Sequence, residues 1–228
     1  MRSKRGAGDQ RLEEALADLA KALNATRAPW MIIGGIAVIA RGVRRMTTDI
    51  DAAVRGDQAD VGSLLRVLAK HRIVPRIDDA EQFAGESLVL LLRHGSTGVD
   101  FDVSMAWTDF EHEAIAASSV AAFGAVKAPM ARPEDLIVFK AIAGRPRDIE
   151  DATALLVLYP DLDRDRMRDQ VKQLAALADQ PELAHGLETA ITISTPKPKR
   201  VRIPNARSKV PSATRTRAAK AKPGNRRR

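Results

Sequence analysis

Two aspartates that are two positions apart, Asp49 and Asp51, lie in an apolar segment whose composition favours a β-strand. Side chains alternate between the two faces of a strand, so both carboxylates are expected on the same face. Neighbouring carboxylates repel each other, and a fold tolerates them best when a positive charge lies between them. Mg²⁺ is the first candidate because it prefers carboxylate and phosphate oxygens. The pair therefore predicts a magnesium site suited to phosphate chemistry.

Two glycines, Gly34 and Gly35, precede the aspartates and follow an apolar run at residues 30–33. The pattern predicts a strand, a tight Gly-Gly turn and a short helix over residues 36–40. Without Cβ atoms the turn can approach a phosphate closely, and the first amides of the helix would point at it. Thr48, next to the aspartate pair, either hydrogen-bonds a phosphate or simply favours the strand.

A third carboxylate is expected from a second strand over residues 99–105, where apolar and polar residues alternate. Its polar face carries Asp100 and Asp102. A turn at residues 95–98 joins this strand to the apolar run at residues 88–93, which predicts a hairpin.

We expect Asp102 rather than Asp100 to be the third metal ligand, with Asp100 as the other candidate. Asp100 lies close to the turn, where a charge is easily solvated. Asp102 lies deeper in the strand, where an unpaired charge would be costly without a cation. The alternative interpretation is that all four acids are surface residues on solvated strand faces or in turns.

Two glycines, a spacer of thirteen residues and an Asp-x-Asp pair with apolar neighbours make a pattern that resembles the polymerase-beta-like nucleotidyltransferase superfamily. The spacer is at the long end of what that family allows. The resemblance covers residues 28–158 and looks most like small bacterial AbiEii-like toxin and antibiotic-modifying enzymes. It implies the Mg²⁺-dependent transfer of a nucleoside monophosphate from an NTP, such as ATP, to an acceptor, by two metal ions on Asp49, Asp51 and Asp102 or Asp100.

The segment PEDLIVFKAIAGRPRDIED at residues 133–151 resembles the C-terminal motif of the same family. This resemblance implies that Lys140 faces the triphosphate. It also implies that Arg145 and Arg147 bind phosphate or pair with Asp148 and Asp151. The alternative is electrostatic stabilisation of helix ends, because bases near the end of one helix and acids at the start of the next need no ligand.

The composition indicates a single globular domain with a small helical appendage. The chain has 228 residues, of which 45% are hydrophobic, and it contains no cysteine, which excludes disulfides and thiolate zinc sites. No apolar run approaches the roughly 20 residues that span a bilayer, and no signal peptide is recognisable. We expect a cytoplasmic protein. The four histidines show no ligand spacing and are expected at the surface or half-buried.

Hydrophobic periodicity predicts an α/β (α+β) fold with a small mixed sheet flanked by helices. Four parts are expected, namely an N-terminal helix (1–27), a nucleotidyltransferase core (28–130), a C-terminal helical part (131–192) and a basic tail (193–228). Within the core, residues 78–86 are expected to form a loop or helical turn, and residues 120–123 and 126–128 to form edge strands.

Residues 195–228 hold thirteen of the 37 Lys and Arg residues and none of the 29 Asp and Glu residues, so the remainder of the chain is mildly acidic. We expect this tail to be disordered and to bind RNA or tRNA through phosphate contacts, although a solubilising role is the alternative. A toxin–antitoxin role, with an antitoxin or another neighbouring-gene product as partner, is a further expectation. The competing hypothesis is a catalytically lapsed module that binds nucleic acid or a partner protein.

Overall fold

The computed structural model describes residues 6–56 and 60–195, which belong to one compact unit, Met1–Pro196. The expected disorder of the basic tail concerns residues that, apart from 193–195, lie outside the described part. The division of the described chain into a core and a helical part at residue 131 stays a prediction. No helix in the described part is long and apolar enough to cross a membrane.

A mixed β-sheet forms the centre of the described chain, as the sequence predicted. Its seven strands are arranged in the order β3-β4-β5-β2-β1-β7-β6. The strands are β1 (Trp30–Ile32), β2 (Asp49–Arg55), β3 (Ile73–Pro75), β4 (Val89–His94), β5 (Asp100–Ala106), β6 (Ser119–Phe123) and β7 (Val126–Met130). β2 pairs parallel with β5 and β1 pairs parallel with β7, whereas the other neighbours are antiparallel.

Alternation along β2 and β5 separates an apolar face from an acidic one. On the apolar face, Ile50, Ala52, Phe101 and Val103 are fully buried. Each large apolar side chain buried in this way stabilises the fold by about 1.5–3 kcal/mol relative to exposure. This burial fixes the register, because a slip of one residue would exchange the two faces. The acids of the other face are therefore held in place by the core beneath them.

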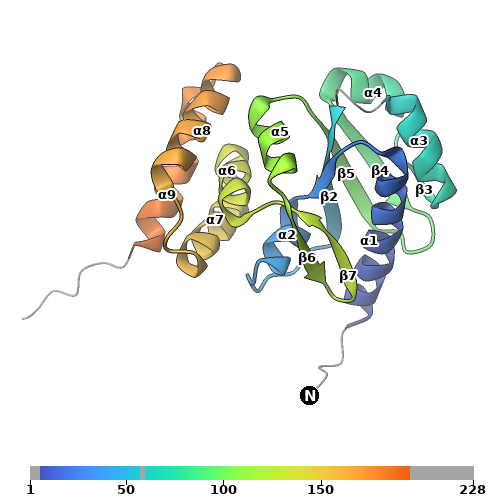
Figure 1. Ribbon diagram of the computed structural model, residues 1–228, viewed down its shortest axis with the longest axis horizontal. Helices are drawn as coiled ribbons and strands as arrows, with labels where there is room; N and C mark the ends of the chain where they lie inside the picture. Colours follow the sequence, from blue (N-terminus) through green and yellow to red (C-terminus); the bar gives the residue numbers. More distant parts are fainter. Residues whose placement is uncertain (1–5, 57–59, 196–228) are drawn as a thin grey trace, which may run out of the picture. The chain divides into compact units, whose positions relative to one another are not determined.

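Helices cover both faces of the sheet. They are α1 (Ala7–Thr26), α2 (Gly34–Ala40), α3 (Val61–Lys70), α4 (Ala80–Ser87), α5 (Asp109–Ala116), α6 (Pro133–Ala143), α7 (Pro146–Leu158), α8 (Arg164–Leu177) and α9 (His185–Ser194), with a short 3₁₀ helix, η2 (Pro181–Ala184). Figure 1 shows α6 to α9 gathered on one side of the strands, with α1 and α3 on the other. α6 contacts each of the other three C-terminal helices and also α2, which connects this group to the glycine pair.

The helix ends follow local chemistry. Thr108 and Glu111 form a capping box at the start of α5, and the Asp60 side chain caps α3. α6 and α7 both begin with proline, and Gly144 ends α6 at a φ of 64°, a left-handed conformation that suits glycine.

Four expectations about the elements need correction. Residues 80–87 form a helix of two turns, where a loop or a single helical turn was expected. β7 is not an edge strand, because it pairs with both β1 and β6. α2 begins at Gly34, so the glycines open the helix rather than form a turn before it. Hydrophobic periodicity also predicts a helix over residues 181–190, but the last helix begins at His185, after the 3₁₀ turn.

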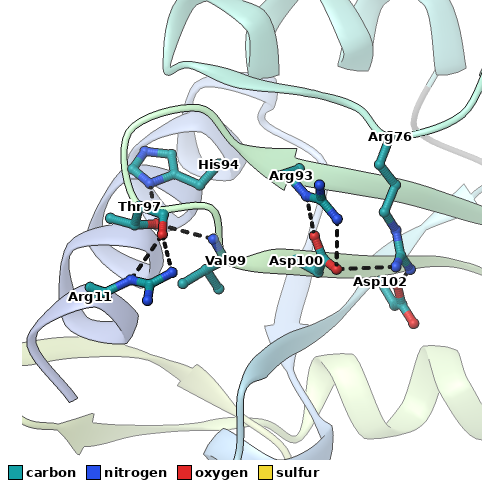
Figure 2. A network of polar contacts seen from close by, with 8 residues as sticks. All are labelled: Arg11, Arg76, Arg93, His94, Thr97, Val99, Asp100 and Asp102. Atoms are coloured by element: carbon teal, nitrogen blue, oxygen red, sulfur yellow. Dashed lines mark hydrogen bonds and ion pairs between the residues drawn. The ribbon is translucent and has the colours of Figure 1, made fainter. Parts of the chain in front are cut away.

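The hairpin of β4 and β5 is confirmed, and its end is fixed to α1. His94 is fully buried, not surface or half-buried as expected, and its Nδ1 lies 2.9 Å from the Thr97 hydroxyl. Its Nε2 lies 3.3 Å from a carboxylate oxygen of Asp18 in α1. Arg11, also in α1, donates to the carbonyl oxygen of Thr97 (Figure 2). These contacts hold the start of β5, and therefore Asp100, relative to α1.

Candidate active site

The register of β2 and β5 brings the four predicted acids together. Asp49 lies opposite Asp100, and Asp51 lies opposite Asp102. Neighbouring strands are about 4.8 Å apart, so these four carboxylates crowd one face of two adjacent strands. The acid pair and the third-carboxylate strand, which are far apart in sequence, thus form one acidic patch.

The glycine pair lies directly against this patch. A Cβ atom on Gly34 would lie 1.8 Å from Asp51 Oδ2, and Gly34 has a φ of +59°. A Cβ atom on Gly35 would lie 2.4 Å from the Thr47 hydroxyl oxygen, which in turn donates to Asp49 Oδ1 at 2.8 Å. Any side chain at residue 34 or 35 would therefore displace an acid or the threonine that orients one.

Asp51 carries the clearest electrostatic perturbation in the patch. Burial, followed by the charges of Asp49 and Asp102, raises the pKa of Asp51 to about 6, although Lys140 and a hydrogen bond from the Gly35 backbone oppose the shift. A carboxylate in this position is stabilised by additional positive charge. The donors are oxygens of the kind that Mg²⁺ prefers, so the patch fits a magnesium ion in chemistry.

The patch is not yet arranged as a metal site. Across residues 6–56 and 60–195, no three His, Cys, Asp or Glu side chains form a group that could hold a metal ion as they stand. Two of the acids are instead paired with Arg76, whose guanidinium forms ion pairs with both Asp100 and Asp102 (Figure 2). Metal binding at Asp102 would require Arg76 to release it.

One hollow, of about 350 Å³, lies on the glycine side of Asp49, and we call it the glycine-side hollow. The side chains that line it include those expected to bind the triphosphate: Thr48, Lys140, Arg145 and Arg147, beside Gly34 and Gly35. Cations, backbone amides and the aspartate pair therefore meet in one cavity.

The cations of the glycine-side hollow are paired with acids of α7. Lys140 Nζ lies 2.7 Å from Asp148 Oδ1 and 3.1 Å from Asp151 Oδ2, and Arg145 Nε lies 3.0 Å from Asp148 Oδ2. Arg147 instead donates to the carbonyl oxygen of Met46. Both interpretations of residues 133–151, phosphate binding and pairing at the helix ends, thus have a structural basis. The cations line the glycine-side hollow, and Lys140 and Arg145 also pair with acids of α7.

A second hollow, of about 540 Å³, lies on the other side of Asp49 and is called the hairpin-side hollow. It is bordered by Asp100 and Asp102, by the first turn of α1, and by Arg76. Asp100 is held by Arg93 Nε at 2.7 Å, and this contact lowers the pKa of Asp100. We expected Asp102 to be the more buried of the two acids, which is wrong: its side chain is 42% exposed, against 31% for Asp100.

Several arginines around the patch were missed by sequence reasoning. Arg93 could have been found, because the predicted hairpin places it directly opposite Asp100. Arg45, which forms an ion pair with Asp151, and Arg76, which follows the short edge strand β3, have no local signal. Their positions depend on how distant segments pack.

This combination of fold and site places the protein among the nucleotidyltransferases, as the resemblance predicted. It belongs to the family described as "Nucleotidyltransferase of unknown function (DUF6036)", whose model matches residues 10–183. The narrower resemblance to AbiEii-like enzymes stays a prediction. No curated protein matches the chain.

The fold is similar to that of a solved structure. The solution structure of the antibiotic-resistance factor ANT(2'')-Ia has a TM-score of 0.51 at 17% identity, and the match covers 78% of this chain and 98% of that one. JHP933 from Helicobacter pylori has a TM-score of 0.42 at 15% identity, and its match covers 81% of this chain and 89% of that one.

Proposed function

We propose that this nucleotidyltransferase is Mg²⁺-dependent, with two metal ions held by Asp49, Asp51 and Asp102 and with Asp100 beside them. The observation that carries the proposal is the contact of Gly34 with Asp51, which sets the start of α2 against the acid pair. Amides at a helix start bind phosphate oxygens, and carboxylates bind the accompanying cation. Both halves of a metal–triphosphate complex thus have adjacent binding groups.

The NTP is assigned to the glycine-side hollow. Its phosphates would meet the backbone of Gly34 and Gly35, the Thr48 hydroxyl, and the side chains of Lys140 and Arg145. These two cations would exchange Asp148 for phosphate oxygens, which is a replacement of one anionic partner by another. Preorganised positive charge of this kind stabilises the transition state of phosphoryl transfer.

The reaction forms a bond between the acceptor oxygen and the α-phosphorus and breaks the bond from that phosphorus to pyrophosphate, which leaves. Mg²⁺, when bound, neutralises charge on the attacking and leaving oxygens. Asp102, which borders the hairpin-side hollow, would accept the proton of the acceptor hydroxyl. Asp51, which is half-buried beside Gly34, would help to hold the metal ions from the neighbouring strand, β2.

The acceptor is proposed to be RNA, including tRNA, because the tail at residues 195–228 is strongly basic and such segments bind nucleic acid through phosphate neutralisation. A toxin–antitoxin role with a neighbouring-gene partner is the corresponding biological proposal. The competing hypothesis, a lapsed module, is disfavoured by the crowded acids, since a site without metal chemistry has no use for carboxylates that repel one another.

The test is incubation of the full chain with each radiolabelled NTP, Mg²⁺ and either total RNA or total protein of the source cell, followed by separation of the fractions. We expect label in RNA with one NTP, and none with Asp51→Asn as the matched inactive control. Label in the protein fraction would overturn the RNA acceptor. Absence of label from RNA, protein and small molecules alike, with every NTP, would favour the lapsed module.

A further inference from the structure

The segment from Arg45 to Asp49 forms a wall between two cavities. Arg45, Thr48 and Asp49 line both the glycine-side and the hairpin-side hollow. The wall is attached to α7, because Arg45 forms an ion pair with Asp151 and Arg147 donates to the carbonyl oxygen of Met46. If the NTP occupies one hollow, the other lies on the opposite side of the same acid and is the natural place for the acceptor.

Three arginines line the hairpin-side hollow, and of these Arg45 is already paired with Asp151. Arg11 reaches it from α1, and both of its described hydrogen bonds go to the carbonyl oxygen of Thr97 (Figure 2). A carbonyl oxygen orients a guanidinium but does not neutralise its charge. Arg76 reaches the hollow from the end of β3, and its partners are Asp100 and Asp102.

Whether the charge of Arg76 is neutralised depends on what else binds Asp100 and Asp102. Asp100 is also held by Arg93, through Nε at 2.7 Å and Nη2 at 3.3 Å. Asp102 is one of the proposed metal ligands, so it would no longer neutralise Arg76 if it held a metal ion. Arg11 and Arg76 then both present positive charge to the hairpin-side hollow.

We propose that the hairpin-side hollow is the acceptor site and that it recognises a phosphate group carried by the acceptor through Arg11 and Arg76. This inference rests on the proposed function, since the reacting hydroxyl must reach Asp49 and Asp102. Guanidinium groups bind phosphate with two parallel hydrogen bonds, which gives geometric selectivity as well as charge.

The size and lining of the hollow fit one nucleotide-sized unit. Its volume of about 540 Å³ is within the usual range for small-ligand sites. Leu12, Ile39 and Phe123 contribute apolar surface beside the arginines, which suits the face of a sugar or base. The phosphate-bearing unit is therefore either the end of an RNA chain or a free sugar phosphate, and both present the same chemistry.

The test uses the full chain in Mg²⁺, with a fluorescent five-nucleotide RNA and, in a separate arm, ribose 5-phosphate. Binding is measured over a range of salt for the wild type, Arg11→Gln and Arg76→Gln. Arg66→Gln is the matched control, because Arg66 is an exposed arginine of α3 outside both hollows. The basic tail is present in every variant, so its contribution is constant.

We expect each hollow variant to weaken RNA binding about three- to tenfold and to lower the salt slope by about one, whereas Arg66→Gln changes neither. Weakening confined to ribose 5-phosphate would also support the site and would identify a small-molecule acceptor. Equal binding of both probes by the wild type, Arg11→Gln and Arg76→Gln would overturn the proposal.

Two further measurements separate this inference from the proposed function. Arg11→Lys keeps the positive charge and should therefore bind the probes more tightly than Arg11→Gln. If Arg11 only held the Thr97 carbonyl, the two variants would lose binding equally. Equal losses would overturn the role of Arg11 as a phosphate ligand. Binding of a non-hydrolysable NTP should be unchanged in Arg11→Gln. If no NTP supports transfer but the binding of RNA or ribose 5-phosphate still depends on Arg11 and Arg76, the proposed reaction is wrong and the phosphate site is retained.

Discussion

The two hollows beside Asp49 contain the same kinds of residue but pair them differently. On the glycine side, Lys140 and Arg145 are paired with Asp148 of α7, an acid that has no proposed part in metal binding. On the hairpin side, Arg76 is paired with Asp100 and Asp102, which are proposed metal ligands. Metal loading should therefore change the charge of the hairpin side far more than that of the glycine side.

This difference has a consequence for the order of events. Cations that are neutralised by independent acids are available to a triphosphate whether or not metal is bound. Cations that are neutralised by the metal ligands become available only after those ligands change partner. The arrangement favours binding of the metal–nucleotide complex first and of the acceptor second.

The largest expected effect comes from the acid pair that both hollows share. Asp49→Asn or Asp51→Asn should reduce transfer by roughly a thousandfold or more, because charge stabilisation by the metal ions is lost. The measurement is incorporation of labelled nucleotide by the folded variants, checked by circular dichroism. Wild-type transfer in either variant would exclude these two residues as metal ligands.

The next effect distinguishes the two acids of β5. Asp102→Ala should eliminate transfer and metal binding, whereas Asp100→Ala should retain transfer within about ten- to a hundredfold of the wild type, since Asp100 is already held by Arg93. Metal affinity can be measured by calorimetry in the presence of a non-hydrolysable NTP. Equal losses would mean that the two acids act together, and the reverse order would assign Asp100 as the third ligand.

A smaller effect is confined to the glycine side. Lys140→Ala should raise the KM for the nucleotide about tenfold, since a charge-assisted contact to phosphate is worth about 1.5 kcal/mol, and should leave the KM for the acceptor unchanged. Lys127→Ala, an exposed lysine of β7, is the matched control. Unchanged nucleotide binding with a lower melting temperature would instead assign Lys140 to the α6–α7 junction alone.

The pKa of Asp51 predicts a pH effect on stability. Because its pKa is raised to about 6 from 3.8, the protonated form is the one that the metal-free fold favours. This contribution is fully present below about pH 4 and is lost as the pH rises through 6, which amounts to at most about 3 kcal/mol. Urea denaturation in EDTA at pH 4.5 and 7.5 should show the loss in the wild type but a smaller one in Asp51→Asn. The same pH dependence in both proteins would contradict the assignment.

The smallest effect on either hollow should come from deletion of residues 197–228. Melting temperature and NTP binding should stay the same, while RNA binding weakens and its salt dependence flattens, because thirteen Lys and Arg residues are removed. Fluorescence anisotropy at several salt concentrations measures this. An unchanged affinity and salt slope would leave the tail with a solubilising role.

Much of the fold could be predicted from the sequence because its signals are local. The alternation at residues 99–105, the turn before it and the proline at the start of α6 each act within a few residues. The placement of each acid pair on one face of its own strand also follows from the period of a strand. The parallel register that sets Asp51 opposite Asp102 does not, because it depends on how two distant segments pack over one core.

The pairing of the acids was harder to predict for the same reason. Asp102 appeared more buried than Asp100 from its place in the strand, but exposure is decided by neighbouring elements, and Arg76 crosses from β3 to reach both acids. The sequence between β3 and α4, which contains Arg76, gives no indication of this contact. The periodicity of β3 or β5 alone does not predict an arginine that reaches from one strand to acids on the other.

The register of β2 and β5 also determines which genetic changes the site can survive. Point substitutions at the four acids remove one carboxylate at a time and leave the other three in register. Deletion of one residue within β2 would move an aspartate to the opposite face, among the buried side chains that include Ile50. A two-residue shift would keep the face but leave a single acid pair in register. Insertions and deletions in this strand should therefore be far rarer among related sequences than in the spacer at residues 41–48.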